Sequence, residues 1–236
     1  MRTPTNLESK TRKLILRNNI LLILLVASIG FITYNQYFQQ NDILYAKGIV
    51  IFDEQGKERI LIGAPVPKTK HRIRDNYDKA MEAWEDEFGP EYKEWYKEYS
   101  HKNYGMLILD ENGYDRLAIG SPTPDPNIGK RLGSATGIEI NDEQGFERSG
   151  YGLMKVNGKN RIVLGLDNDN GTEGMSLILS DEGNTGLFLK NKYGKIFLGK
   201  TEDKNYYTNE FPFKGFMIEN DSLQQEFKYN VLKKKE

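Results

Sequence analysis

The sequence GIVIFDEQGKERILIG at residues 48–63 decides the fold, because its pattern returns three more times along the chain. It returns as GMLILDENGYDRLAIG at 105–120, GIEINDEQGFER at 137–148 and MSLILSDEGN at 175–184. Short β-branched runs on either side of a turn signal predict two strands. Asp at the first turn position and Gly at the fourth predict a type I turn with a bulge. Each copy is therefore predicted to be a β-hairpin, and the recurrence predicts a repeat architecture.

Several of these strands are apolar at consecutive positions, as at residues 106–109 and 162–164. Such runs indicate that both faces of the sheet are at least partly covered. We therefore predict an all-β domain over residues 48–219, built of tandem β-hairpin repeats stacked as a solenoid, a sandwich or an irregular barrel. The pattern leaves these three arrangements open, and residues 220–236 are predicted to be a C-terminal tail or, from residue 223, a short amphipathic helix.

The N-terminal region contains the apolar run ILLILLVASIGFITY at residues 20–34, and no charge occurs between Arg17 and Asp42. With its flanks, the run has the roughly 20 residues needed to cross a bilayer. The alternative is a cleaved signal peptide, but small residues of the A-x-A kind do not follow the run. We predict a transmembrane signal-anchor helix at residues 18–38 and a tether at 39–47.

Basic residues lie on one side of this apolar run, since five precede it and none follows before Lys47. By the positive-inside rule, residues 1–17 are predicted to be a cytoplasmic tail. The β domain is then periplasmic or extracellular, which makes the chain a single-pass membrane protein of the cell envelope.

A helical insertion is predicted at about residues 75–101, between the first two hairpins. Tyr77, Met81, Trp84 and Phe88 fall on one helical face, and a Gly-Pro pair at 89–90 separates them from a second helical segment. This aromatic stripe either packs on the sheet or stays partly open to a partner protein or a glycan. The candidate binding residues are Tyr77, Trp84, Trp95, Tyr96 and Tyr99.

Candidate metal ligands occur in the segment at 167–171, DNDNG, where Asp167, Asp169 and Glu173 could bind Ca²⁺ weakly. The Gly stands one position earlier than in an EF-hand loop, so the alternative is a plain turn. We expect no other cofactor. The basic residues at 68–74 are predicted to form a solvated loop, with contact to anionic lipid headgroups as the alternative.

Catalytic residues are not expected. The chain has no Cys and only two His residues, and neither His stands beside a nucleophile motif or another metal ligand. With 33 basic and 34 acidic residues, the chain carries no excess of positive charge that would attract nucleic acid.

The expected function is that of a non-enzymatic, membrane-anchored scaffold or protein-interaction module. Its contacts would be made by the Pro-led loops after residues 63 and 120, which should lie at one rim of the sheet. The alternative is glycan or cell-wall binding through the aromatic insertion. An envelope hydrolase using loop carboxylates ranks third.

Overall fold

The computed structural model describes residues 6–38, 43–202, 208, 212–220 and 225–232. The chain forms two compact units, Met1–Ala46 and Lys47–Glu236. Residues 39–42 of the tether predicted at 39–47 lie outside the described residues.

The first unit contains one long helix, α1 (Asn6–Phe38). Its candidate spanning segment is Glu8–Asn35, of 28 residues; the most apolar 18-residue window within it has a mean hydropathy of 2.1, and none of that window is buried inside the protein. At about 1.5 Å per residue, this segment exceeds the roughly 30 Å of a bilayer core. The hydroxyls of Ser28 and Thr33 each donate to a carbonyl four residues earlier, at 2.8 Å, so they are satisfied within the helix. The helix is therefore long and apolar enough to span a membrane, and it begins earlier than predicted, within the segment expected to be a tail.

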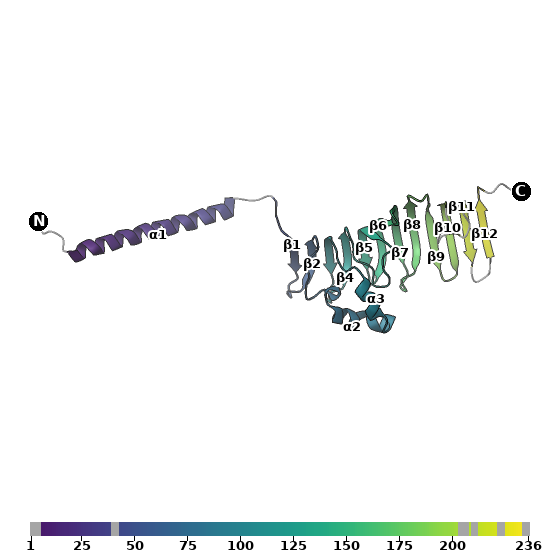
Figure 1. The fold of residues 1–236 in the computed structure, drawn as a ribbon, viewed down its shortest axis with the longest axis horizontal. Coiled ribbons are helices and arrows are strands. Elements are labelled where there is room, and N and C mark those ends of the chain that lie inside the picture. The colour runs from purple at the N-terminus through teal and green to yellow at the C-terminus, as the bar shows by residue number, and fades with distance from the viewer. Residues whose placement is uncertain (1–5, 39–42, 203–207, 209–211, 221–224, 233–236) are drawn as a thin grey trace. The chain divides into compact units, whose positions relative to one another are not determined.

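The second unit contains one antiparallel sheet whose twelve strands follow each other in sequence order (Figure 1). The strands are β1 (Gly48–Phe52), β2 (Glu58–Gly63), β3 (Gly105–Leu109), β4 (Asp115–Gly120), β5 (Ser134–Asn141), β6 (Glu147–Val156), β7 (Lys159–Asp167), β8 (Glu173–Ser180), β9 (Thr185–Asn191), β10 (Gly194–Thr201), β11 (Phe213–Asn220) and β12 (Gln225–Asn230). The predicted hairpins are confirmed, and they lie side by side in one layer with β1 and β12 at its edges. The helix that was the alternative for the C-terminal residues is wrong, because 225–230 pair with β11 as a strand.

The acidic-Gly turns have the predicted conformation. In the first turn, Asp53 Oδ1 accepts from the backbone N–H of Gln55 at 3.0 Å and of Lys57 at 2.9 Å. Gly56 follows with φ 77°, and the pairing shifts register next to the turn, as a bulge requires. Asp110 and Asp142 make the same pair of side-chain bonds in their turns.

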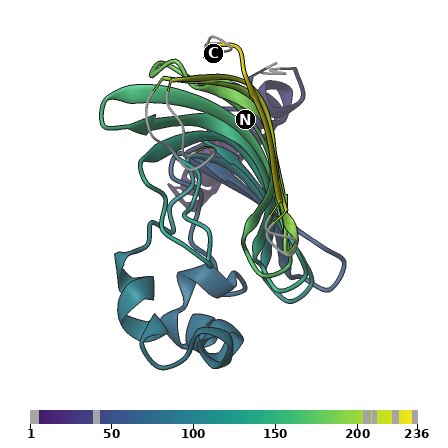
Figure 2. The same cartoon turned by 90° about the vertical axis from the view of Figure 1, so that its right-hand side faces the viewer.

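A row of glycines crosses the sheet at equivalent positions of nine strands. Through the pairing register, the row contains Gly48, Gly63, Gly105, Gly120, Gly137, Gly152, Gly186, Gly199 and Gly215, with Val163 and Ile178 on the two strands between. A Cβ on Gly152 would lie 2.6 Å from the Thr136 carbonyl oxygen of the next strand. Glycine therefore permits the close backbone approach and the strong bend of the strands that Figure 2 shows.

The two faces of this sheet differ in what covers them. One face, named here the closed face, carries buried side chains such as Leu61, Leu107, Phe188 and Phe197. The insertion between β2 and β3 lies on this side, on the inner side of the bend (Figure 2). It contains a short 3-10 helix, η1 (Ile73–Asp75), then α2 (Tyr77–Phe88) and α3 (Tyr92–Glu98), which confirms the predicted pair of helical segments.

The insertion starts at one rim of the sheet and reaches the other. Near its start, Val66 N donates to Asn103 O at 2.8 Å. Farther on, Ile73 N donates to the carbonyl of Gly113, and Trp84 Nε1 donates to the carbonyl of Gln144 at 2.7 Å, both in acidic-Gly turns. The Pro-led loop after residue 63 therefore begins a segment that folds back over the closed face, and the helices contact the turns at the opposite rim.

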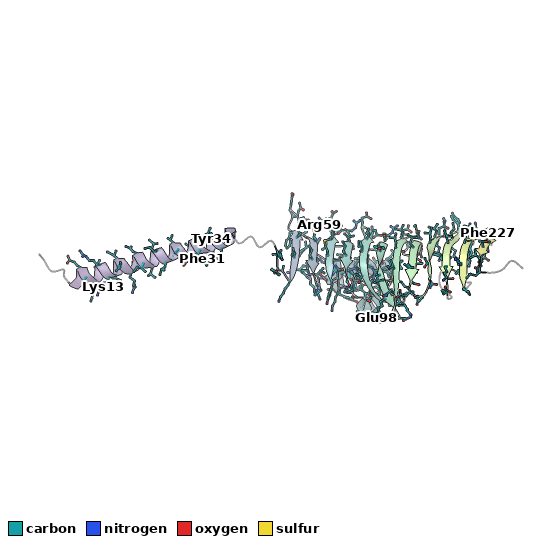
Figure 3. The ribbon with its side chains drawn as sticks, turned by 90° about the horizontal axis from the view of Figure 1, so that it is seen from above. Lys13, Phe31, Tyr34, Arg59, Glu98 and Phe227 are labelled. Atoms are coloured by element: carbon teal, nitrogen blue, oxygen red, sulfur yellow. The ribbon has the colours of Figure 1, made fainter. Side chains whose placement is uncertain are left out.

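The other face, named here the open face, carries two apolar rows with one residue from every strand in each. The first row is Ile49, Ile62, Met106, Ile119, Ile138, Tyr151, Leu164, Leu177, Leu187, Leu198, Phe216 and Tyr229; the second is Ile51, Ile60, Ile108, Leu117, Ile140, Ser149, Leu166, Met175, Leu189, Ile196, Ile218 and Phe227. Many of these side chains are exposed, and side chains project from both sides of the layer along its whole length (Figure 3). The prediction that both faces are covered is therefore wrong for one chain by itself.

Candidate functional site

A cavity of about 580 Å³, named here the insertion cavity, lies between the loops and helices of the insertion. Its wall is mainly basic and aromatic, and it comprises Pro65, Val66, Lys68, Arg72, Arg74, Asp75, Tyr77, Tyr96, Lys97, Tyr99, Ser100, His101, Lys102 and Asn103. Five of these side chains carry positive charge and one carries negative charge. Because the wall combines cations with aromatic rings, the cavity is the best-defined candidate for a ligand site on the protein.

A buried ion cluster forms the floor of the insertion cavity. Arg72 Nε donates to Asp115 Oδ1 at 2.8 Å, and Arg72 Nη2 donates to Asp115 Oδ2 at 2.6 Å. Arg72 Nη1 donates to Asp75 Oδ1 at 3.2 Å and to the His101 carbonyl at 3.1 Å. Burial works against the charged carboxylate, but the Arg72 guanidinium holds the pKa of Asp115 below its usual value. This bidentate pair ties the insertion to strand β4.

Arg74 lies beside this pair and is only 4% exposed. Its Nε is 3.5 Å from Asp115 Oδ2. Within the described part of the chain, neither Nη1 nor Nη2 of Arg74 has a hydrogen-bond partner. Both nitrogens are almost completely shielded from solvent, and leaving such buried donors of a charged group unpaired is costly.

Two neutral polar groups accompany Arg74 in the cavity wall. The Tyr96 and His101 rings stack with centroids 4.2 Å apart, and His101 Nε2 lies 3.1 Å from the Tyr96 carbonyl. A carbonyl only accepts, so Nε2 carries the hydrogen and Nδ1 is left as an acceptor. Burial, with Arg74 next in importance, lowers the pKa of His101 to about 4, and burial raises the pKa of Tyr96 to about 12. Both groups are therefore neutral near pH 7, and they add hydrogen-bonding capacity without adding charge.

The predicted aromatic residues divide into two groups. Tyr77, Tyr96 and Tyr99 line the insertion cavity, and Tyr77 is 40% exposed. Trp84 is buried in the core of the insertion, where its ring lies 5.9 Å from the ring of Tyr96. Trp95 is 48% exposed and is not part of the cavity wall. Packing thus accounts for Trp84 and also for Tyr96, which is only 2% exposed in the same core, whereas Tyr77 and Tyr99 keep part of their surface toward the cavity.

The expectation of a solvated basic loop at residues 68–74 is wrong for Arg72 and Arg74, which are buried. The reason is their partner, Asp115, a strand residue 43 positions after Arg72. Local sequence gives no signal for this, because Arg72, Ile73 and Arg74 are all buried rather than alternating between two faces.

The predicted Ca²⁺ ligands are only partly brought together. Asp167 and Glu173 are register partners at the ends of β7 and β8, and burial, followed by the charge of Glu173, raises the pKa of Asp167 to about 6. Asp169 lies in the turn, which is closed by a bond of 2.9 Å from Asn168 N to the Thr172 carbonyl. Across the described residues, no three His, Asp or Glu side chains come together in a way that could hold a metal ion.

A pair of carboxylates also lies on the closed face, at Glu139 and Glu147. Burial, together with Glu147, raises the pKa of Glu139 to about 7. Both carboxylates face Arg131, which forms a short ion pair with Glu139 and lies 3.6 Å from Glu147. These acids lie on strands β5 and β6 and share one cation, so their arrangement is explained by charge neutralisation within the fold.

No family model, no curated protein and no solved structure matches the chain.

Proposed function

We propose that this protein is a membrane-anchored, non-enzymatic binding protein of the cell envelope that holds an anionic glycan in the insertion cavity. The observation that carries the proposal is the buried Arg74 guanidinium, whose terminal nitrogens have no hydrogen-bond partner among the described residues and which lines the cavity. A carboxylate or phosphate group presents two oxygens at the spacing of a guanidinium fork, and such paired bonds are among the strongest in proteins.

Charge supports an anionic ligand. Arg72 is already compensated by Asp115 and Asp75, whereas Lys68 and Lys102 project from the exposed wall of the cavity. An incoming anion would therefore meet an excess of positive charge before it reaches Arg74. The attraction acts at long range and falls with ionic strength.

The remaining wall supports a sugar. Tyr77 and Tyr99 offer aromatic surface beside the cationic groups, and sugar rings stack on such faces. A volume of about 580 Å³ falls within the usual range of small-ligand sites, roughly 300–1,000 Å³.

The setting at the membrane rests on α1 and on the distribution of basic residues before it. We propose that α1 spans the cytoplasmic membrane with its N-terminus inside, and that the unit Lys47–Glu236 is exported. A wall or surface polysaccharide carrying acidic groups would then be the natural ligand class.

Binding is tested with the full-length protein in detergent micelles, by calorimetric titration. The probes are a galacturonic acid trimer, the same trimer as its neutral methyl ester, and glucose 6-phosphate. We expect the acidic trimer or the sugar phosphate to bind at least tenfold more tightly than the ester, because a charged hydrogen bond contributes about 1.5–3 kcal/mol. Which acidic probe binds more tightly distinguishes carboxylate from phosphate, and equal binding of acid and ester would contradict the proposal.

Variants connect the binding to the cavity. Arg74→Lys keeps the charge but loses the fork, and we expect it to weaken binding about tenfold. The Lys102 side chain is exposed, so Lys102→Gln should leave the fold intact. We expect it to weaken binding about threefold and to reduce the dependence of the binding affinity on salt. The matched control is Lys93→Gln on α3, because Lys93 pairs with Glu85 at 2.8 Å and does not line the cavity. Binding that is unchanged in Lys102→Gln, or that is lost equally in Lys93→Gln, would place the ligand elsewhere.

A further inference from the structure

The open face is a long apolar surface that no described segment of the second unit covers. Its two rows draw a residue from each of the twelve strands, and every position is apolar or aromatic except Ser149. Tyr151 is 56% exposed and Phe227 is 61% exposed. The described segments that fold back over the sheet, including the helices, lie on the closed face (Figure 2).

The area of this surface can be compared with what a stable interface needs. Twelve strands about 4.8 Å apart span about 53 Å, and two rows occupy about 14 Å along the strands, so the stripe covers roughly 750 Å². The largest apolar patch on a typical soluble monomer is about 300–600 Å². A stable protein interface buries about 800 Å² on each partner.

The chemistry of the stripe favours protein over lipid as its cover. Surfaces that lie on a bilayer combine apolar side chains with Lys and Arg for the headgroups, whereas neither row contains a charged residue. Unbroken rows of Ile, Leu and aromatic side chains are typical of the inner face of a β-sandwich, where a second sheet packs about 10 Å away.

We propose that the open face packs against the open face of a second copy of this chain, so that two single-layer sheets form one sandwich. The contact is isologous, because the same rows from both copies meet about a two-fold axis near β6 and β7. Two copies anchored by α1 in one membrane would be held at high effective concentration, which promotes such pairing. This inference is independent of the ligand proposed for the insertion cavity.

The chain contains no Cys, so a single introduced Cys reports proximity without background. Tyr151→Cys places a thiol near the centre of the open face, on the sixth of twelve strands. With full-length protein in its own membranes, a short bismaleimide should crosslink this variant to a dimer. Glu111→Cys, in the exposed turn between β3 and β4, is the matched control and should remain monomeric.

A second variant tests whether the face drives the pairing. Leu177→Glu introduces a charge in the middle of the first row at an exposed position, so the monomer should keep its circular dichroism spectrum. We expect the dimer seen by light scattering in detergent to dissociate at least a hundredfold more readily, because a buried unpaired charge is strongly unfavourable. A dimer that survives Leu177→Glu would be paired through the edges β1 and β12 instead and would overturn the proposal. If the full-length wild-type protein is a monomer in detergent and the Tyr151→Cys variant gives no crosslinked dimer, the proposal is overturned as well, whether or not the full-length protein binds neutral lipid vesicles.

Discussion

The substitution Asp115→Asn tests the buried ion cluster on which the insertion depends. The Asp115 side chain is 3% exposed and accepts two hydrogen bonds from Arg72, at 2.8 and 2.6 Å. Asn keeps the size of the side chain but loses the charge and one acceptor. The buried Arg72 guanidinium then keeps only its ion pair with Asp75, and the buried Arg74 guanidinium loses the carboxylate that lies 3.5 Å from its Nε.

The magnitude follows from the burial of both partners. Removing one member of a buried ion pair typically costs about 3–5 kcal/mol, because the remaining charge stays desolvated. The two lost or weakened charged hydrogen bonds, at about 1.5–3 kcal/mol each, give a similar figure. We therefore expect the free energy of unfolding to fall by about 3–5 kcal/mol, which is a large share of the stability of an ordinary domain.

The assay is urea unfolding of the full-length protein in detergent micelles, followed by the fluorescence of Trp84. Trp95→Phe is introduced in all samples, so that Trp84, buried against Tyr96, is the single reporter. With a slope near 2 kcal/mol per molar urea, the midpoint should move down by roughly 1.5–2.5 M.

The matched control is Glu94→Gln, which removes the carboxylate of an exposed pair with Lys97 in the same insertion. Solvent screens such a pair, so its midpoint should stay within error of the parent. If Asp115→Asn shifts the midpoint no more than Glu94→Gln does, the buried cluster does not stabilise the insertion and the reasoning fails.

Three further predictions concern local features of the second unit. The pKa of His101 is lowered to about 4 from 6.5, so the neutral form stabilises the fold above pH 6.5. This contribution to the free energy of unfolding should be lost as the pH falls through 4. Urea unfolding across this pH range should show the loss in the parent protein and not in His101→Asn. Gly152→Ala should lower the melting temperature by several degrees, because its Cβ would clash with the neighbouring strand. Gly129→Ala is the control and should not lower it, because a Cβ there meets nothing within 4 Å. Equal melting temperatures of the two variants would contradict the role of the glycine row. Trp84→Phe loses a buried hydrogen bond of 2.7 Å to a turn carbonyl and should cost about 1–3 kcal/mol in chemical unfolding, whereas Trp95→Phe, at an exposed position, should leave the midpoint unchanged.

The sequence by itself determined the local elements of this protein. The acidic-Gly turns, such as the one at Asp53, depend on bonds between residues two to four positions apart, so their chemistry can be recognised in the chain. The apolar stripe of α2 and the Gly-Pro break after Phe88 act over equally short distances. The apolar length of α1 is likewise a property of a continuous segment.

A smaller part of the candidate site was also visible in the sequence. Tyr77, Tyr96 and Tyr99 were predicted as binding residues because aromatic side chains exceeded what a solvated helix needs, and they line the cavity. The same reasoning could not separate them from Trp84, since a residue on an apolar helical face can either pack or bind. What decided the difference was the position of Gln144, in a turn 60 residues away.

Only the tertiary structure decided the features that carry the proposals. Arg72 and Arg74 are buried because strand β4 brings Asp115 to them. Asp115 is far from both in the sequence, so a local pattern cannot predict this contact. The open face and the glycine row exist only through the register of twelve strands, which sets every second side chain on one face. Turns and helices follow from bonds between near neighbours in the chain, whereas burial, charge pairing and the exposure of a whole face depend on which distant residues lie next to each other.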